Sequence, residues 1–185
     1  MAPDNKRIRV GVIFGGRSGE HEVSLVSATA VIDALDKEKY EVVPIGITSE
    51  GRWLSSSQVL NLLKSKTGLE QEPERFLVPE PRRRALVSVN GESEGAIQLD
   101  VVFPLVHGTF GEDGTLQGLL ELTNIPYVGS GVLASAIGMD KIIQKQLHGR
   151  AGLPVVKYFW FFSSECKAYV KRVVAAVERK LKYPM

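Results

Sequence analysis

A short apolar run that ends in two glycines limits the fold of this chain more than any other feature. The run extends from Ile8 to Phe14 and leads directly into Gly15 and Gly16. Such a run is typical of a strand buried on both faces, and the glycines indicate a tight turn at its end. Apolar residues then recur at a spacing close to 3.6, at Val23, Val26, Ala30 and Leu35. Residues 22–37 are therefore predicted to form an amphipathic helix.

Two further apolar runs extend this opening into a sheet. Residues 40–47 follow the helix closely, which predicts a β-α-β unit with parallel strands and a right-handed crossover. Residues 99–106 form a third run of the buried-strand type, and we expect it in the same sheet. The pattern predicts an α/β fold in which the strands at 8–14, 40–47 and 99–106 share one parallel sheet.

The remaining segments are expected to alternate between helix, strand and surface loop. In order, they are a surface excursion at 63–84, an edge strand at 85–89, a turn at Asn90-Gly91, a helix at 113–122, a short strand at 126–129, a helix at 132–148, a β-rich segment at 155–162 and a helix at 165–180. Gly149 and Pro154 lie where the long helix should end. We predict one domain over residues 1–131 and the beginning of another over 132–185.

Composition describes an ordinary folded chain. Of the 185 residues, 44% are apolar and 24% are charged, which excludes the disordered, collagen-like and coiled-coil classes. No apolar stretch approaches the ~20 residues of a transmembrane helix, and the first residues do not resemble a signal peptide. Cys166 is the single cysteine, so an internal disulfide and a cysteine-based metal site are excluded. We expect a cytoplasmic protein.

Charge is divided unevenly along the chain. Residues 1–140 hold 13 Lys and Arg against 19 Asp and Glu, whereas residues 141–182 hold 10 basic residues against Glu165 and Glu178. A basic segment of this kind can serve nucleic acid, a membrane surface or a phosphate ligand. A solvated helix face explains it equally well.

Carboxylates follow the glycines at the end of the first strand. Glu20 and Glu22 lie where a strand turns into a helix, and the glycine patterns of dinucleotide and P-loop sites are absent. Two carboxylates would repel a phosphate, whereas a carboxylate at the edge of an α/β sheet suits the ammonium group of a substrate. The alternative is that both carboxylates complement the positive end of the helix, which contributes roughly 0.3–1 kcal/mol each.

A second glycine-rich loop, His107 to Gly118, follows the strand at 99–106. It should therefore lie at the same carboxyl edge of the sheet, where α/β proteins bind ligands. His107 could contact a substrate carboxylate or polarise a carbonyl, or it could bond only to a neighbouring loop backbone. Farther along, Lys141 is followed one turn later by Lys145, although a lone helical lysine is usually solvated.

Taken together, these segments resemble the D-alanine:D-alanine ligase family. The four matching blocks occur in the family's order and spacing: Gly15 to Ser24, His107 to Gly118, Tyr127 to Ala136, and Met139-Asp140-Lys141. The resemblance covers nearly the whole chain and fades over residues 55–95 and 156–180. It implies a Rossmann-like parallel-sheet domain followed by the start of an ATP-grasp α+β domain. The related D-alanine:D-lactate and D-alanine:D-serine ligases share these blocks.

The resemblance also implies roles for particular residues. Glu20 would bind the ammonium group of the first D-alanine, His107 and Val23 would lie beside that substrate, and Lys141 would reach the phosphates of ATP. The implied reaction phosphorylates the carboxylate of one D-alanine, and the amine of a second D-alanine attacks the acylphosphate to form the dipeptide used in peptidoglycan synthesis. ATP and Mg²⁺ are the implied cofactors, and a homodimer through the first domain is the implied assembly, with no role for nucleic acid or membrane.

The chain departs from the family pattern at its end. Family members continue beyond Pro184 into a second ATP lysine, a glycine- and serine-rich loop, and acidic metal ligands, whereas this chain stops at Met185. The metal ligands are therefore expected to be absent, and the chain is expected to be an amino-terminal piece without ligase or ATPase turnover of its own. A folded module for substrate binding or dimerisation is the alternative to an enzyme.

Overall fold

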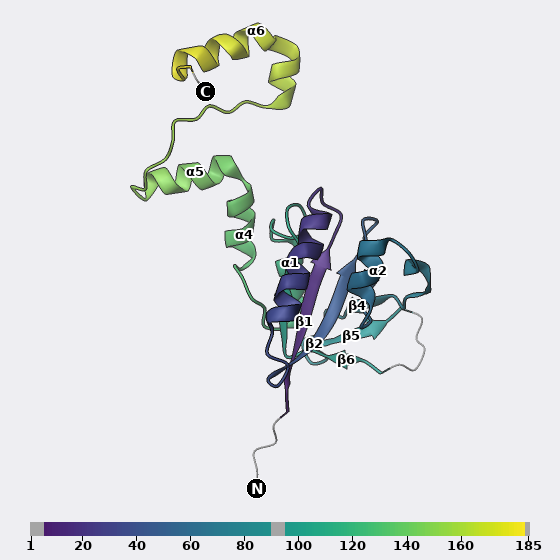
Figure 1. Cartoon of the computed structure of the whole chain (residues 1–185). Helices are drawn as coiled ribbons and strands as arrows, with labels where there is room; N and C mark the ends of the chain where they lie inside the picture. Colours follow the sequence, from purple (N-terminus) through teal and green to yellow (C-terminus); the bar gives the residue numbers. More distant parts are fainter. Residues whose placement is uncertain (1–5, 90–94, 184–185) are drawn as a thin grey trace. The chain divides into compact units, whose positions relative to one another are not determined.

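The computed structural model describes residues 6–89 and 95–183 (Figure 1). The turn expected at Asn90-Gly91 lies outside the described residues. The chain divides into two compact units, residues 1–139 and 140–185.

A four-stranded sheet forms the centre of the first unit. Its order is β3-β2-β1-β7, from strands Trp53–Leu54, Tyr40–Ile47, Ile8–Gly15 and Val101–Pro104. β1 pairs in parallel with both β2 and β7, and only the short β3 is antiparallel. The prediction that the first three buried runs share one parallel sheet is confirmed.

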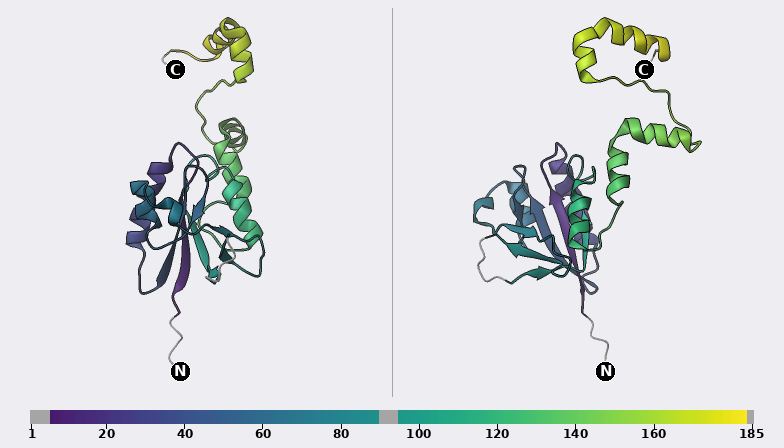
Figure 2. Two further views of the ribbon diagram at one scale, coloured as in Figure 1. Left: turned by 90° about the vertical axis from the view of Figure 1, so that its right-hand side faces the viewer. Right: turned by 180° about the vertical axis from the view of Figure 1, so that it is seen from behind.

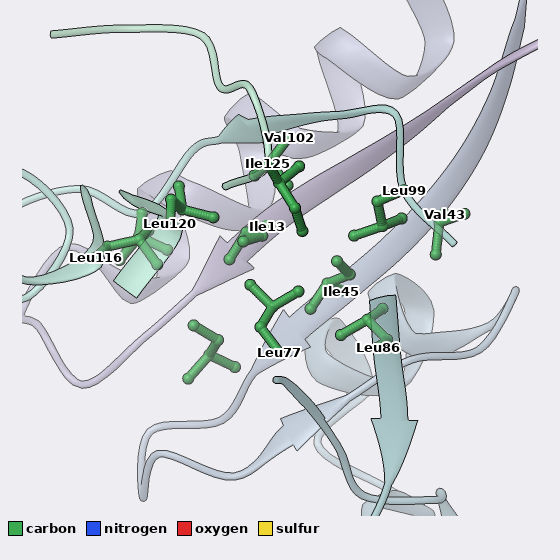
Figure 3. Close-up of a cluster of buried hydrophobic side chains, with 12 residues drawn as sticks. Ile13, Val43, Ile45, Leu77, Leu86, Leu99, Val102, Leu116, Leu120 and Ile125 are labelled. Atoms are coloured by element: carbon green, nitrogen blue, oxygen red, sulfur yellow. The ribbon is translucent and has the colours of Figure 1, made fainter. Parts of the chain in front are cut away.

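The sheet is buried on both faces. Alternate residues of β1 point to opposite sides: Val12 and Phe14 pack with α1 (His21–Ala34) and α2 (Val59–Ser65), whereas Ile13 packs on the other side. There it meets Leu116 and Leu120 of α3 (Thr115–Thr123), in the cluster of Figure 3. Figure 2 shows α1 and α2 together on one side of the sheet. Burial on both faces explains why these strands are apolar runs rather than alternating sequences.

The buried face of α1 differs from the predicted one. Its buried residues are Ser24, Leu25 and Ala28, whereas Val23 and Val26 are 56% and 68% exposed. The helix is apolar around most of its circumference, so two stripes satisfy helical spacing and the sequence pattern alone does not choose between them. The buried stripe contains the small residues Ser24 and Ala28, which allow the helix to approach the sheet closely.

The predicted surface excursion is in part a second layer of structure. It contains η1 (Leu69–Gln71) and β4 (Arg75–Leu77), which joins β5 (Ala85–Ser88) and β6 (Ile97–Gln98) in an antiparallel sheet. β5 is the middle strand of that sheet, so its prediction as an edge strand is wrong. Leu77 and Leu86 are buried in the same cluster as Ile13 (Figure 3).

The carboxyl-terminal third is mostly helical. The predicted short strand at 126–129 is a single bridge between Tyr127 and Val102. The predicted helix at 132–148 is two helices, α4 (Val132–Met139) and α5 (Lys141–Arg150), because Asp140 has extended backbone angles and caps α5 by accepting from the amides of Ile142 and Ile143. Residues 153–162 form neither helix nor strand, and α6 follows at Ser163–Lys180. Within the described residues, no helix is both long and apolar enough to cross a membrane.

Candidate functional site

Two loops meet at the carboxyl edge of the parallel sheet. One follows β1 and leads into α1, and the other follows β7 and leads into α3. The first begins with Gly15, at a φ of 86°, where an added Cβ would lie 2.2 Å from the carbonyl oxygen of Ile47. Only glycine allows the chain to turn this close to β2. This edge is where α/β sheets bind ligands.

Ser24, in the first turn of α1, bonds to both loops. Its side chain is fully buried, and Oγ accepts from the amide of Gly15 at 2.7 Å. The same hydroxyl donates to the carbonyl oxygen of Leu105 at 2.6 Å. The first bond is buried and the second partly buried, and together they hold the end of β1 and the segment after β7 at a set separation.

Ser18 links the tips of the loops and places Glu20 beside His107. Its Oγ donates to the carbonyl oxygen of His107 at 2.7 Å and accepts from the amide of Glu20 at 3.2 Å. The carboxylate of Glu20 lies against Gly108, where an added Cβ would be 3.1 Å from Oε2. Two residues that are distant in sequence are thus brought to one place, as the sequence predicted for residues at the same sheet edge.

The imidazole of His107 also contacts α1. Its Nε2 lies 3.0 Å from Oγ of Ser27, and its Nδ1 lies 3.9 Å from Oε1 of Glu112. Ser27 is within 3.1 Å of the carbonyl oxygen of Val23, one turn earlier in the helix. His107 is therefore bonded through both its backbone and its ring, and Val23 lies one helical turn from the ring's partner. The Val23 side chain is exposed, so a ligand beside this site can contact it.

Glu22 has a different environment from Glu20. Its Oε1 forms an ion pair with Nζ of Lys66 at 2.9 Å. The hydrogen bond to Lys66, together with the charge of that lysine, lowers the pKa of the Glu22 carboxyl below its ordinary value. Glu22, the second residue of α1, thus pairs with Lys66 just after α2, whereas Glu20, which precedes α1, is the carboxylate beside the His107 loop.

The second loop has anchors of its own. Asp113 accepts from the amides of Phe110 and Thr115 at 2.9 and 3.0 Å, and the buried Gln117 donates to the carbonyl oxygen of Gly111 at 2.8 Å. Burial opposes ionisation of Asp113, but these amide bonds outweigh it and lower the pKa of the carboxyl. The guanidinium of Arg17 lies 4.4 Å from the centre of the Phe110 ring, which adds a contact between the loops.

A cavity of about 260 Å³ opens between the same loops on the α3 side of the sheet. Its walls include Arg17, Trp53, Phe110 and Leu119, but neither Glu20 nor His107. The predicted substrate residues therefore lie on the α1 side of the loops, outside this cavity.

Lys141 belongs to the second unit, whereas the other three predicted site residues belong to the first. It is exposed and is the first residue of α5. The same unit contains a cavity of about 1010 Å³ whose lining includes four basic residues, Lys145, Arg150, Lys157 and Lys180, among apolar ones such as Ile143 and Leu147. Nζ of Lys145 lies 5.1 Å from the centre of the Tyr158 ring in its wall. Lys141 is not among the lining residues, and no three metal-ligating side chains gather within residues 6–89 and 95–183.

The hydroxyls that hold the site together were not predicted from the sequence. Three serine side chains bond the first loop or α1 to the segment after β7, and none was among the predicted site residues: Ser18, Ser24 and Ser27. A signal was present, because Ser24 and Ser27 interrupt an otherwise apolar helix face at a spacing of three residues. Polar residues on such a face indicate buried hydrogen bonds rather than solvent contact.

Known proteins are similar to this chain in both sequence and fold. The profile of the family described as "D-ala D-ala ligase N-terminus" matches residues 9–130. The D-alanine–D-alanine ligase of Natranaerobius thermophilus is 45% identical over 182 residues, which are 97% of this chain and 49% of the relative. The D-Ala:D-Ser ligase VanG of Enterococcus faecalis matches with a TM-score of 0.79 at 34% identity, over 97% of this chain and 51% of that one. The D-alanine-D-alanine ligase of Coxiella burnetii matches with a TM-score of 0.77 at 34% identity, over 92% and 49%. The chain spans about half the length of these relatives.

Proposed function

Since the chain belongs to the D-ala D-ala ligase N-terminus family, we propose that it forms the first-substrate half of an ATP-dependent D-alanine:D-alanine ligase. The observation that carries the proposal is the junction of two glycine-rich loops at the carboxyl edge of the sheet. There, Ser18 bonds to both the amide of Glu20 and the carbonyl of His107. A rigid edge with one carboxylate and one imidazole suits a small zwitterionic substrate.

Each of the three first-unit residues has a separate role in this proposal. The carboxylate of Glu20 accepts hydrogen bonds from the ammonium group of the first D-alanine, a charge-assisted contact. The imidazole of His107 lies beside that substrate and contacts its carboxylate side, and Val23 contributes apolar surface next to the methyl group. Holding the substrate in one orientation is the main contribution that such a half-site can make to the rate.

Lys141 is proposed to reach the phosphates of ATP. It is an exposed cation at the start of α5, in the unit that holds the basic cavity, and this chemistry fits a polyphosphate. When bound, ATP supplies the phosphoryl group that activates the first carboxylate, and Mg²⁺ offsets the charge of the phosphates. The described residues offer cations for the nucleotide but no clustered ligands for the metal.

Three further assignments belong to the same proposal. We assign residues 1–131 to substrate binding and residues 132–185 to the beginning of an ATP-grasp domain, whereas the compact units divide after Met139. We place the protein in the cytoplasm, as a homodimer that associates through its first unit. Sedimentation equilibrium of the purified chain measures that association directly, and a monomer at all concentrations contradicts it.

A D-alanine:D-serine ligase is the second candidate. It is favoured by the similarity to the ligase from Enterococcus faecalis, at 34% identity over nearly all of this chain. The two functions differ only in the second substrate. They are separated by offering D-alanine and D-serine in competition and identifying the dipeptide by mass spectrometry.

The central experiment tests Glu20 in an active enzyme. A chimera is made in which this chain replaces the matching half of the Natranaerobius thermophilus ligase, and ADP release is measured against D-alanine concentration. Glu20→Gln keeps the shape but removes the charge, so kcat/KM for D-alanine should fall roughly tenfold to a hundredfold while KM for ATP stays unchanged. Glu22→Gln is the matched control, because Glu22 pairs with Lys66 and should have little effect. Equal losses in both variants would assign the effect to the helix terminus instead.

The 185-residue chain tested alone should release no ADP above background. The described residues hold no cluster of metal ligands, and only Lys141 is proposed to contact the phosphates. ADP release that depends on both the chain and D-alanine would contradict this expectation.

A further inference from the structure

We propose that Ser27 is a positioning residue whose hydroxyl sets the orientation and the tautomer of the His107 imidazole. The inference deepens the proposed function and rests on it, because His107 matters to the reaction only if it lies beside the substrate. Nothing in the motif around Ser27 indicates this role, since the serine belongs to α1 and His107 follows a strand 80 residues later.

The ring of His107 lies between two partners. On one side, Nε2 is 3.0 Å from Oγ of Ser27, a hydrogen-bond distance. On the other side, Nδ1 is 3.9 Å from Oε1 of Glu112, while the second oxygen of that carboxylate accepts from the amide of Gly108 at 2.8 Å. Glu112 is thus held by the loop itself, with one oxygen directed toward the ring.

These two partners select one neutral tautomer. A lone pair on Nδ1 would face the negative charge of Glu112, whereas a proton on Nδ1 is attracted to it. With the proton on Nδ1, Nε2 is an acceptor, and Ser27 is the group that donates to it. The tautomer with the proton on Nδ1 is the minor form of free histidine in water, so its dominance would identify the environment.

The hydroxyl of Ser27 suits this task because it both donates and accepts. When the imidazole is cationic, Nε2 carries a proton and Oγ becomes the acceptor. The hydroxyl proton then turns to the carbonyl oxygen of Val23, 3.1 Å away. The ring keeps the same partner in both charge states and does not need to move, which an alanine or valine at position 27 could not provide.

NMR spectroscopy of the 185-residue chain measures the tautomer of His107 directly, without an assay of activity. Long-range ¹H–¹⁵N spectra of imidazole-labelled protein distinguish protonated from unprotonated ring nitrogens, and His21, His107 and His148 are the only histidines to assign. A His107→Gln variant identifies the His107 signals. We expect the neutral His107 ring to carry its proton on Nδ1, and Ser27→Ala to shift both ring nitrogens toward the averaged values of a free imidazole.

Two variants serve as controls. Ser27→Thr retains the hydroxyl and should restore the wild-type ring signals. Thr29→Val removes a hydroxyl that also bonds one turn back in α1, to Leu25 at 2.7 Å, but has no contact with His107, so the ring signals should not change. If the signals of Ser27→Ala coincide with those of the wild type, or if wild-type Nε2 carries the neutral proton, the proposal is wrong.

The chimeric ligase then separates this proposal from the proposed function. Ser27→Ala should lower kcat/KM for D-alanine about fivefold, and Ser27→Thr should recover most of the loss. If the ring signals respond as expected but neither Ser27→Ala nor Glu20→Gln alters the kinetics, the proposed function fails while the positioning of His107 stands. If Glu20→Gln acts but the ring signals are unaffected by Ser27→Ala, only the role of Ser27 fails.

Discussion

The two units of the chain use apolar residues in opposite ways. In the first unit, the buried core extends from Val10 to Ile125 and covers both faces of the sheet. In the second unit, neither α5 nor α6 has a buried residue, although Val170 and Val174 lie one turn apart on α6 and are 54% and 47% exposed. Similar helical patterns therefore lead to different outcomes in the two units. In the first unit, α1, α2 and α3 bury residues in the core around the sheet, whereas caps and local bonds define α5 and α6 of the second unit.

The largest expected difference between the units comes from a matched pair of leucines. Leu120 in α3 is fully buried, whereas Leu147 in α5 is 45% exposed. Leu120→Ala should destabilise the protein by about 3 kcal/mol through lost burial and a cavity, and Leu147→Ala by less than about 0.5 kcal/mol. Urea denaturation followed by circular dichroism measures both. Similar losses in the two variants would show that the second unit has a core of its own.

The next effect concerns the hydroxyl that joins the two loops. Ser24→Ala leaves the buried amide of Gly15 and the carbonyl of Leu105 without their shared partner, which should cost about 2 kcal/mol. Ser164→Ala, on the exposed first turn of α6, is the matched control and should be nearly neutral. The midpoints of thermal unfolding of the two variants provide the measurement. A neutral Ser24→Ala would mean that the loops are held elsewhere.

A smaller effect, dependent on pH, is expected at Asp113. Its amide bonds lower the pKa of the carboxyl below 3.8 in the folded protein, so its stabilising contribution is present above that value and is lost as the pH falls through the folded pKa. Asp113→Asn should therefore lower the free energy of unfolding at pH 7 and pH 5 by a fraction of a kcal/mol, less than about 0.5 kcal/mol, and the difference from wild type should shrink below about pH 3.8. Denaturant titrations at these pH values, with wild type in parallel, check the sign. A difference that grows on acidification contradicts it.

The smallest global effect is expected at the cap of α5. Asp140→Ala removes two amide bonds, at 3.0 Å each, and should weaken the helix locally by about 1 kcal/mol. Because α5 contributes no buried residue, the global unfolding midpoint should not change. Hydrogen exchange should show faster exchange of the amides of α5 and unchanged protection of β1. A lowered global midpoint would show that the two units unfold together.

Much of the first unit was predictable from the residues alone. The apolar runs at 8–14, 40–47 and 99–106 require burial on both faces, and glycines after the first and third runs indicate turns. The parallel sheet and the meeting of Glu20 with His107 therefore follow from local rules. The break at Asp140 was also visible in principle, because aspartate competes for the amides that would continue a helix. The helix predicted at 165–180 follows from its periodicity, although the backbone of Tyr169 is not helical (φ −140°, ψ 49°) and kinks it.

Other features depended on contacts between distant segments. Which stripe of α1 faces the sheet was not predictable, since Val23 and Val26 fit helical spacing as well as Leu25 and Ala28 do. Likewise β4 is too short to be recognised by pattern, and the pattern of the strand predicted at 85–89 does not reveal its partners. The two strands form a sheet because they pair with each other and bury Leu77 and Leu86. The serine bonds that orient His107 belong to the same class. The sequence carries the period of each element, whereas the partner of each side chain is decided by the free energy of packing the whole unit.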